Sequence, residues 1–339
     1  MSVEATWFDF LLAAFVLFCA LRALTVSSLY QSALFFIAFG LSMAIAWTRL
    51  WAPDVALAEA AIGAGLLGVL FFDSLRVYQG PGGASGERRG AGKVADMVSP
   101  KGWLGGMVFG LVLVLLAVFA GFLATALYFM PVGGGLTEVA GRHLEDSGVE
   151  HPVTAVLLNY RSFDTWLEIG VLVVAMLGVF CSGRLVGFCE NENRPGERDG
   201  LVEWMARFLV PLLVVMAGYL LWQGKFAPGG AFQAGVLLGA AGILWHLVGR
   251  RFLVAWKGWW WKTALIGGFC LFLVHGVVSL WWAGTFLAYP SGWAGSIIFL
   301  LELGATLSIG FALLALFVYL HENDRPRKTR AREKRKEAL

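Results

Sequence analysis

Charged residues are scarce in this chain. Only 14% of its 339 residues are Asp, Glu, Lys or Arg, whereas 58% are hydrophobic, and this composition excludes a soluble domain. Cysteine is also rare, and the four that occur follow no metal-binding or redox spacing: Cys19, Cys181, Cys189 and Cys270. We therefore expect neither a disulfide nor an iron–sulfur cluster. Because the sequence also lacks a nucleophile–base set, a nucleotide-binding loop and a cluster of metal ligands, we predict no catalysis, no cofactor, no bound metal and no nucleic-acid partner.

Long apolar runs fill most of the chain and predict an all-α polytopic membrane protein. The first run follows a segment with no basic residues and no clear cleavage site, which favours a retained helix over a cleaved signal peptide. We expect about nine membrane-spanning helices, near Trp7–Leu24, Tyr30–Thr48, Pro53–Val77, Trp103–Tyr128, Asp164–Arg184, Val202–Trp222, Phe232–Leu247, Ala264–Trp282 and Ser296–Tyr319.

Basic residues are distributed unevenly over the two sides of these alternating spans. Of the 26 lysines and arginines, all but four fall on the side that carries the C-terminus. The four on the opposite side are Arg49, Arg142, Arg161 and Lys225. Because cytoplasmic loops are enriched in Lys and Arg, we predict a cell inner (plasma) membrane protein with an external N-terminus and a cytoplasmic C-terminus.

Two polar segments divide the spans into groups of three, two and four helices. The predicted organisation is a three-helix module at 1–78, a Gly-rich cytoplasmic linker at 79–102, a two-helix module at 103–188 with an external loop at 129–163, a cytoplasmic joint at 189–200, a four-helix module at 201–320 and a basic cytoplasmic tail at 321–339. The tail is expected to act as a positive-inside anchor, and contact with anionic lipid or an acidic partner is the alternative.

Four acidic residues lie in or at the predicted spans: Glu59, Asp164, Glu168 and Glu302. A carboxylate inside a membrane helix costs about 2.5–3.5 kcal/mol on insertion scales, so such groups usually face a protein interior or an ion pathway. Asp164 and Glu168 are four residues apart and share a helix face, where they could share a cation or a proton. The alternatives are structural: a neighbouring hydroxyl or amide would cap Glu59, and Asp164 would cap the N-terminus of its helix.

Three basic residues complete the predicted ion or proton path. Lys225 precedes Pro228-Gly229-Gly230, where it either acts as a counter-ion for the carboxylates or snorkels from a hairpin turn. His246 and His275 lie in apolar runs, where a histidine either relays protons or hydrogen-bonds to a neighbouring helix.

Three motifs resemble known families. The run D-V-A-L-A-E-A-A-I-G-A-G-L at 54–66 resembles the D-type module of membrane-bound hydrogenases, which is also found in the C-terminal extension of the large A-type protein of Mrp-type cation/proton antiporters. The run V-L-L-N-Y-R-S-F-D-T-W-L-E-I-G-V at 156–171, continuing to 179, resembles the E-type module that follows it. The run L-L-W-Q-G-K-F-A-P-G-G-A-F-Q-A-G-V at 220–236 resembles the B-type component of the same antiporters.

The resemblance implies a fusion of auxiliary modules that works beside other antiporter-like subunits in a hetero-oligomer. The implied function is that of a membrane subunit of an Mrp-type Na⁺/H⁺ antiporter or a related complex, in contact with Na⁺ or H⁺ and with lipids. Three alternatives stay open. They are a structural scaffold, an ion-pumping subunit of a membrane-bound hydrogenase or complex I-like redox assembly, and a subunit of an ion-driven uptake complex.

Overall fold

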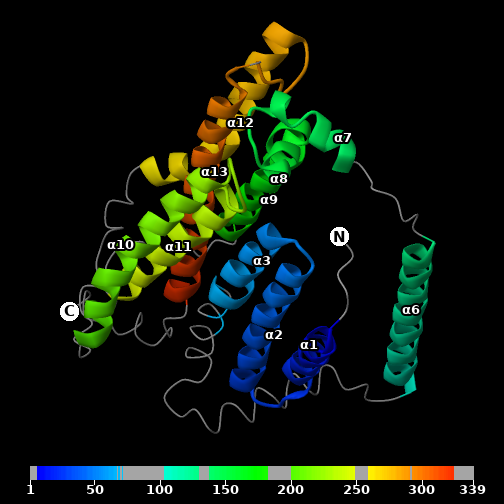
Figure 1. Cartoon of the computed structure of the whole chain (residues 1–339). Helices are drawn as coiled ribbons and strands as arrows, with labels where there is room; N and C mark the ends of the chain where they lie inside the picture. Colours follow the sequence, from blue (N-terminus) through cyan, green and yellow to red (C-terminus); the bar gives the residue numbers. More distant parts are fainter. Residues whose placement is uncertain are drawn as a thin grey trace.

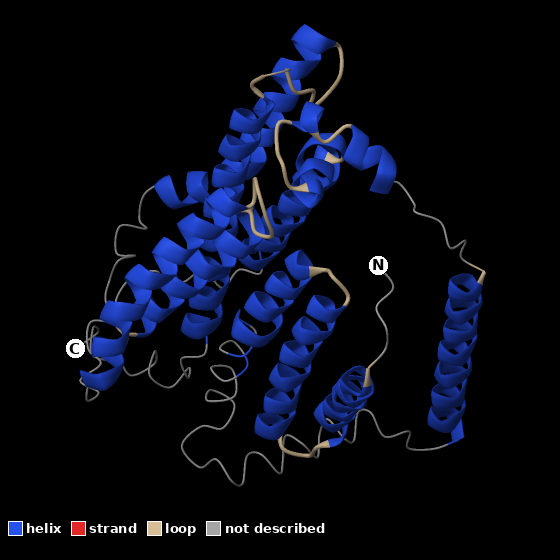
Figure 2. Cartoon of the chain, in the orientation of Figure 1, coloured by secondary structure: helices blue, strands red, loops and turns tan. Residues whose placement is uncertain are grey.

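The computed structural model describes residues 6–66, 68, 71, 103–129, 137–181, 200–248, 259–290 and 292–323. Within these ranges the regular structure is helical and no strand occurs (Figure 2). Six helices are long and apolar enough to cross a membrane, and two shorter apolar helices cover 110–126 and 231–247. The predicted all-α polytopic fold is therefore confirmed. The predicted linker at 79–102, the joint at 189–199 and the tail beyond Asn323 lie outside the described residues.

The N-terminal part of the chain forms three neighbouring helices: α1 (Trp7–Thr25), α2 (Leu29–Arg49) and α3 (Pro53–Glu59), the last continuing as the π-helical stretch η1 (Ala60–Leu66). Pro53 occupies the first turn of α3, where its fixed φ suits the helix and its missing N–H is not needed. The Asp9 carboxylate accepts hydrogen bonds from Arg49 Nε and Nη2 at 2.8 and 3.0 Å. This paired contact ties the start of α1 to the end of α2.

The middle of the chain contains one isolated helix and a series of short ones. Helix α6 (Trp103–Tyr128) is set apart from the other helices in Figure 1. The segment predicted as an external loop is largely helical from Thr137 onwards: α7 (Thr137–Arg142), a 3₁₀ turn η2 (Glu145–Ser147), α8 (Pro152–Ala155) and a π-helical turn η3 (Val156–Tyr160), followed by the long α9 (Ser162–Cys181). Its apolar residues Val149, Ala155 and Leu158 are buried, which explains why this segment folds onto the bundle.

The C-terminal part is a four-helix bundle: α10 (Gly200–Gln223), α11 (Ala231–Leu247), α12 (Trp260–Ala283) and α13 (Ala294–Asn323). Helices α11 and α13 approach closely because glycines line their contact. A Cβ atom on Gly235 would lie 2.7 Å from Ile309 Cβ, and one on Gly310 would lie 3.1 Å from Leu238 Cβ. Helix α13 is the central element, since it also packs against α9, α10 and α12.

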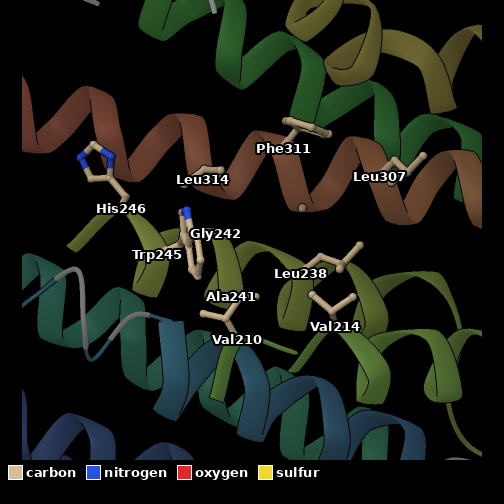
Figure 3. A pocket seen from close by; sticks show the side chains of 11 residues that line it. Val210, Val214, Leu238, Ala241, Gly242, Trp245, His246, Leu307, Phe311 and Leu314 are labelled. Carbon is tan, nitrogen blue, oxygen red and sulfur yellow. The ribbon is translucent and has the colours of Figure 1, made fainter. Parts of the chain in front are cut away.

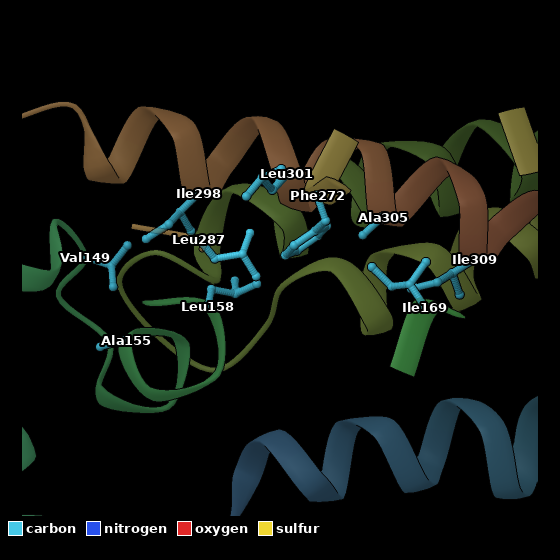
Figure 4. Close-up of a cluster of buried hydrophobic side chains, with 10 residues drawn as sticks. All are labelled: Val149, Ala155, Leu158, Ile169, Phe272, Leu287, Ile298, Leu301, Ala305 and Ile309. Atoms are coloured by element: carbon cyan, nitrogen blue, oxygen red, sulfur yellow. The ribbon is translucent and has the colours of Figure 1, made fainter. Parts of the chain in front are cut away.

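A shared apolar core joins the middle and C-terminal parts. The cluster in Figure 4 combines residues from the short helices, α9, α12, the α12–α13 connection and α13: Val149, Ala155, Leu158, Ile169, Phe272, Leu287, Ile298, Leu301, Ala305 and Ile309. A second cluster adds Met176 of α9 to residues of α11, α12 and α13. Among the described residues, the first three helices contribute none to the buried apolar clusters. Contacts of another kind therefore join these helices to the rest of the chain.

Candidate ion-path site

Glu302 is the most enclosed of the predicted carboxylates, with 3% of its surface exposed. It lies on α13 and faces the first residues of α11, where the Ala231 amide donates a hydrogen bond to its carboxylate. A Cβ atom on Gly230, whose φ is 111°, would lie only 2.8 Å from Glu302 Oε1. Unpaired amides and the helix dipole favour negative charge at a helix N-terminus. The fold therefore places Glu302 in a buried position that favours an anion.

Glu59 lies where the backbone of the third helix changes from α to π geometry. It is the last residue of α3, and η1 begins at Ala60. Its half-buried carboxylate lies over Gly63, where a Cβ atom would be 2.5 Å from Glu59 Oε1. Single π-helical turns are frequent at functional sites because they re-aim side chains and leave backbone groups free of regular pairing. The missing side chain at Gly63 therefore makes room for the Glu59 carboxylate.

Asp54 joins the first three helices to the rest of the chain, and sequence reasoning did not select it as a site residue. Its carboxylate lies 3.0 Å from His151 Nε2 and accepts a hydrogen bond from the Gly229 amide at 3.2 Å. Its own carbonyl accepts a hydrogen bond from the Gln233 side chain at 3.2 Å. We call Asp54, His151, Gly229 and Gln233 the module junction. In the sequence, Asp54 stands out only as an acidic residue that directly follows Pro53 at the start of a helix. Such a position indicates a first-turn residue and does not predict a contact with a distant part of the chain.

The second pair of predicted carboxylates lies on the outside of the described part of the chain. Asp164 forms an ion pair with Arg161. It is the third residue of α9 and so does not occupy the N-cap position that was its structural alternative. Glu168, one turn further on, is exposed and borders an open hollow of about 390 Å³ together with Val171, Leu172 and Phe232. Both side chains therefore share a face of α9 as predicted, and that face is directed away from the buried core.

Lys225 lies in the turn between α10 and α11. Its carbonyl accepts hydrogen bonds from the amides of Glu150 and His151, both at 3.0 Å, and its ammonium group lies 5.6 Å from the ring centre of Phe226. Among the described residues no carboxylate lies within ion-pair distance of this ammonium group. Within the described ranges, Lys225 therefore has no carboxylate for which it could act as the predicted counter-ion. Its backbone instead connects the α10–α11 turn to the segment before α8.

The two predicted histidines occupy different surroundings. The His275 ring lies on α12, 4.8 Å from the ring of Tyr289, and hydrogen-bonds to the backbone of Ala288. Its Nε2 atom is buried without a hydrogen-bond partner in the ranges that the structure describes. Burial raises the pKa of the Tyr289 phenol, which therefore stays protonated beside this ring.

His246 lies near the end of α11 and faces an apolar groove. Its ring meets Phe317 edge to face at 6.3 Å. The groove, about 370 Å³ in volume, lies between α10, α11 and α13 (Figure 3). Its other labelled lining residues are apolar, which separates His246 from the carboxylates near the start of α11. The structure therefore does not bring His246 together with the other predicted site residues.

Comparisons with known proteins identify two parts of the chain. Residues 14–79 match the family model MbhD, which represents the D component of MBH. Residues 201–321 match the model described as "Domain related to MnhB subunit of Na+/H+ antiporter". The motifs at 54–66 and 220–236 were assigned to these two families, so both assignments are confirmed. The assignment of 156–179 to an E-type module stays a prediction.

A solved structure has the same fold. A chain in "Structure of Mrp complex from Dietzia sp. DQ12-45-1b" superimposes with a TM-score of 0.72 at 20% sequence identity, covering 96% of this chain and 36% of that chain. This chain thus spans little more than a third of the length of its structural relative. The curated protein sequences contain no match. Together, the two family models show that this multi-pass membrane protein joins an MbhD-type module at 14–79 to an MnhB-related module at 201–321, and the chain shares the fold of the Mrp complex chain.

Proposed function

We propose that this chain is a membrane subunit of an Mrp-type Na⁺/H⁺ antiporter complex and that its carboxylates lie on the ion or proton path. The observation that carries the proposal is that one helix, α11, borders both the buried Glu302 and the segment that carries Glu59. Glu302 faces the N-terminus of α11, and the π-helical stretch that follows Glu59 packs against α11 as well. Intramembrane carboxylates in such enclosed positions are typical of proton and cation relays.

The surface of the chain supports an assembly with other membrane subunits. Glu168 presents a carboxylate on the exposed side of a membrane-spanning helix, a placement that is unfavourable against lipid. A neighbouring subunit that offers a cationic or hydrogen-bonding side chain at this hollow would remove the penalty. The partners we propose are therefore other antiporter-like subunits, with the N-terminus of this chain external and its C-terminus cytoplasmic.

The test is the variant Glu302→Gln in the intact complex. The amide keeps the shape of the side chain and loses the titratable charge, so Na⁺/H⁺ exchange in everted membrane vesicles should fall by about tenfold or more, as expected for a proton-transfer group. Glu138→Gln is the matched control, because Glu138 is exposed on α7 and, among the residues that the structure describes, pairs with Arg142 alone. Normal exchange in a fully assembled Glu302→Gln complex would exclude Glu302 from the path.

A structural scaffold makes a different prediction for the same position. If Glu302 only joins α13 to α11, Gln should be tolerated because its amide oxygen still accepts from Ala231. Ala should weaken assembly, because it leaves a buried amide unpaired. Comparison of the Gln and Ala variants by exchange rate and by yield of assembled complex separates the two functions.

A further inference from the structure

The module junction is the polar contact through which three parts of the chain meet. Asp54 comes from the start of α3, His151 from the residue before α8, and Gly229 and Gln233 from the turn before α11 and its first residues. The side chains of Asp54 and His151 are 15% and 12% exposed, so their contact is largely shielded from solvent. Ion pairs and charge-assisted hydrogen bonds are stronger in such surroundings than at an open surface.

The module junction lies close to Glu59 and Glu302, so a small movement of the helices at the junction would displace both carboxylates. Glu59 follows Asp54 on the same helix by five residues, or about 7.5 Å along the axis. On the other side of the contact, Gly229 directly precedes Gly230, where a Cβ atom would lie 2.8 Å from Glu302 Oε1. The first three helices contribute no residue to the buried apolar clusters of the described chain, so packing of large side chains does not set their register.

We infer that Asp54 is a positioning residue, which acts by holding α3 in register with α11 through His151 and the Gly229 amide. This inference rests on the proposed function in so far as the carboxylates it positions carry ions. Asp54 accepts two hydrogen bonds from two different parts of the chain, and a third bond uses its carbonyl. Loss of the side chain leaves both donors unpaired and frees α3 to slide or tilt against α11.

The experiment uses the full chain in its intact complex and measures position separately from transport. The four cysteines are replaced, and spin labels are attached at Leu50→Cys and Phe226→Cys, two exposed positions on opposite sides of the module junction. The distance distribution between the labels reports the register, and Na⁺/H⁺ exchange in vesicles reports transport. Asp54→Ala removes both acceptor atoms. Asp54→Asn keeps one oxygen that accepts from Gly229 and presents an amide NH2 that donates to His151 Nε2 when the ring proton is on Nδ1.

Asp9→Ala is the matched control, because it removes the ion pair with Arg49 inside the first three helices and leaves the module junction intact. We expect Asp54→Ala to broaden the distance distribution and to lower exchange by about tenfold or more, in line with the effect of displacing catalytic groups by about 1 Å. Asp54→Asn should keep a narrow distribution and retain most of the exchange. Asp9→Ala should leave the distribution unchanged.

Any of the following results would overturn the inference. An unchanged distribution in Asp54→Ala with lost exchange would mean that Asp54 acts on the ion itself, and a broadened distribution with normal exchange would mean that register does not matter. If Asp54→Ala prevents assembly, His151→Ala and Gln233→Ala each remove one contact, and an unchanged distribution in both would be equally decisive. If the unmodified complex shows no Na⁺/H⁺ exchange, the proposed function fails, while the distance measurement still tests the positioning role.

Discussion

The carboxylate of Glu59 lies directly over Gly63, four residues further along the chain, where a Cβ atom would be 2.5 Å from Oε1. This contact belongs to the π-helical stretch that begins at Ala60, and Gly63 also faces the Gly40 backbone of α2, 3.8 Å from the same Cβ position. The absence of a side chain at 63 thus provides the space in which the acid of the third helix lies. The position of the Glu59 carboxylate therefore depends on the backbone geometry of the third helix.

We predict that Gly63→Ala shifts the Glu59 side chain while the complex still assembles. The atom that the new methyl group meets is the mobile end of a glutamate, so the stability loss should be small, of the order expected for an ordinary substitution, about 1 kcal/mol. Exchange should nevertheless fall if Glu59 carries ions, and vesicle assays would measure this. Gly121→Ala in α6 is the control, because its Cβ would meet nothing within 4 Å. Equal exchange in the two variants would contradict a functional placement of Glu59.

For Glu168, we predict that the Gln variant assembles normally and loses most cation/proton exchange. Gln keeps the shape and hydrogen-bonding capacity of the side chain but removes the charge that the path would use. Because Glu168 is exposed in this chain, its replacement should not disturb the internal packing of α9. Normal exchange in a fully assembled Glu168→Gln complex would remove this residue from the path. If the Ala variant assembles weakly and the Gln variant assembles normally, Glu168 instead contacts a partner subunit.

Phe272 tests whether the middle and C-terminal parts share one core. Its side chain is fully buried in the cluster of Figure 4, between residues of α9 and α13. Phe272→Ala should therefore lower the free energy of unfolding by about 3–5 kcal/mol, the usual range for removing a buried aromatic ring. The melting temperature of the purified complex in detergent would report it. Phe122→Ala in α6 should have little effect on the chain itself, because Phe122 is 72% exposed.

The orientation of the chain can be tested with terminal tags. The uneven distribution of Lys and Arg predicts that a reporter after Leu339 is cytoplasmic and that a tag before Trp7 is external. Impermeant labelling of intact cells should then reach the N-terminal tag only. Labelling of both ends from the same side would rule out an odd number of spans.

Composition was sufficient to predict the fold class, and the resemblance of two motifs to known families predicted two of the module assignments. A membrane helix is recognisable from its long apolar run, because backbone and side chains must be satisfied without water. Helices α1, α2, α10, α12 and α13 lie within a few residues of their predicted bounds, since each coincides with such a run. The D-type and B-type motifs were also recognisable from the chain alone, as the family models confirm.

The tertiary structure decided which acids are enclosed and which side chains hold the modules together. Glu302 and Glu168 both lie near the outer ends of apolar runs, yet only Glu302 is buried, because α13 is surrounded by helices whereas one face of α9 is not. The contact between Asp54 and His151 joins residues 97 positions apart, so no local pattern could predict it. Local sequence determines hydrophobicity and helix ends, but pairing between distant polar groups depends on how the helices pack.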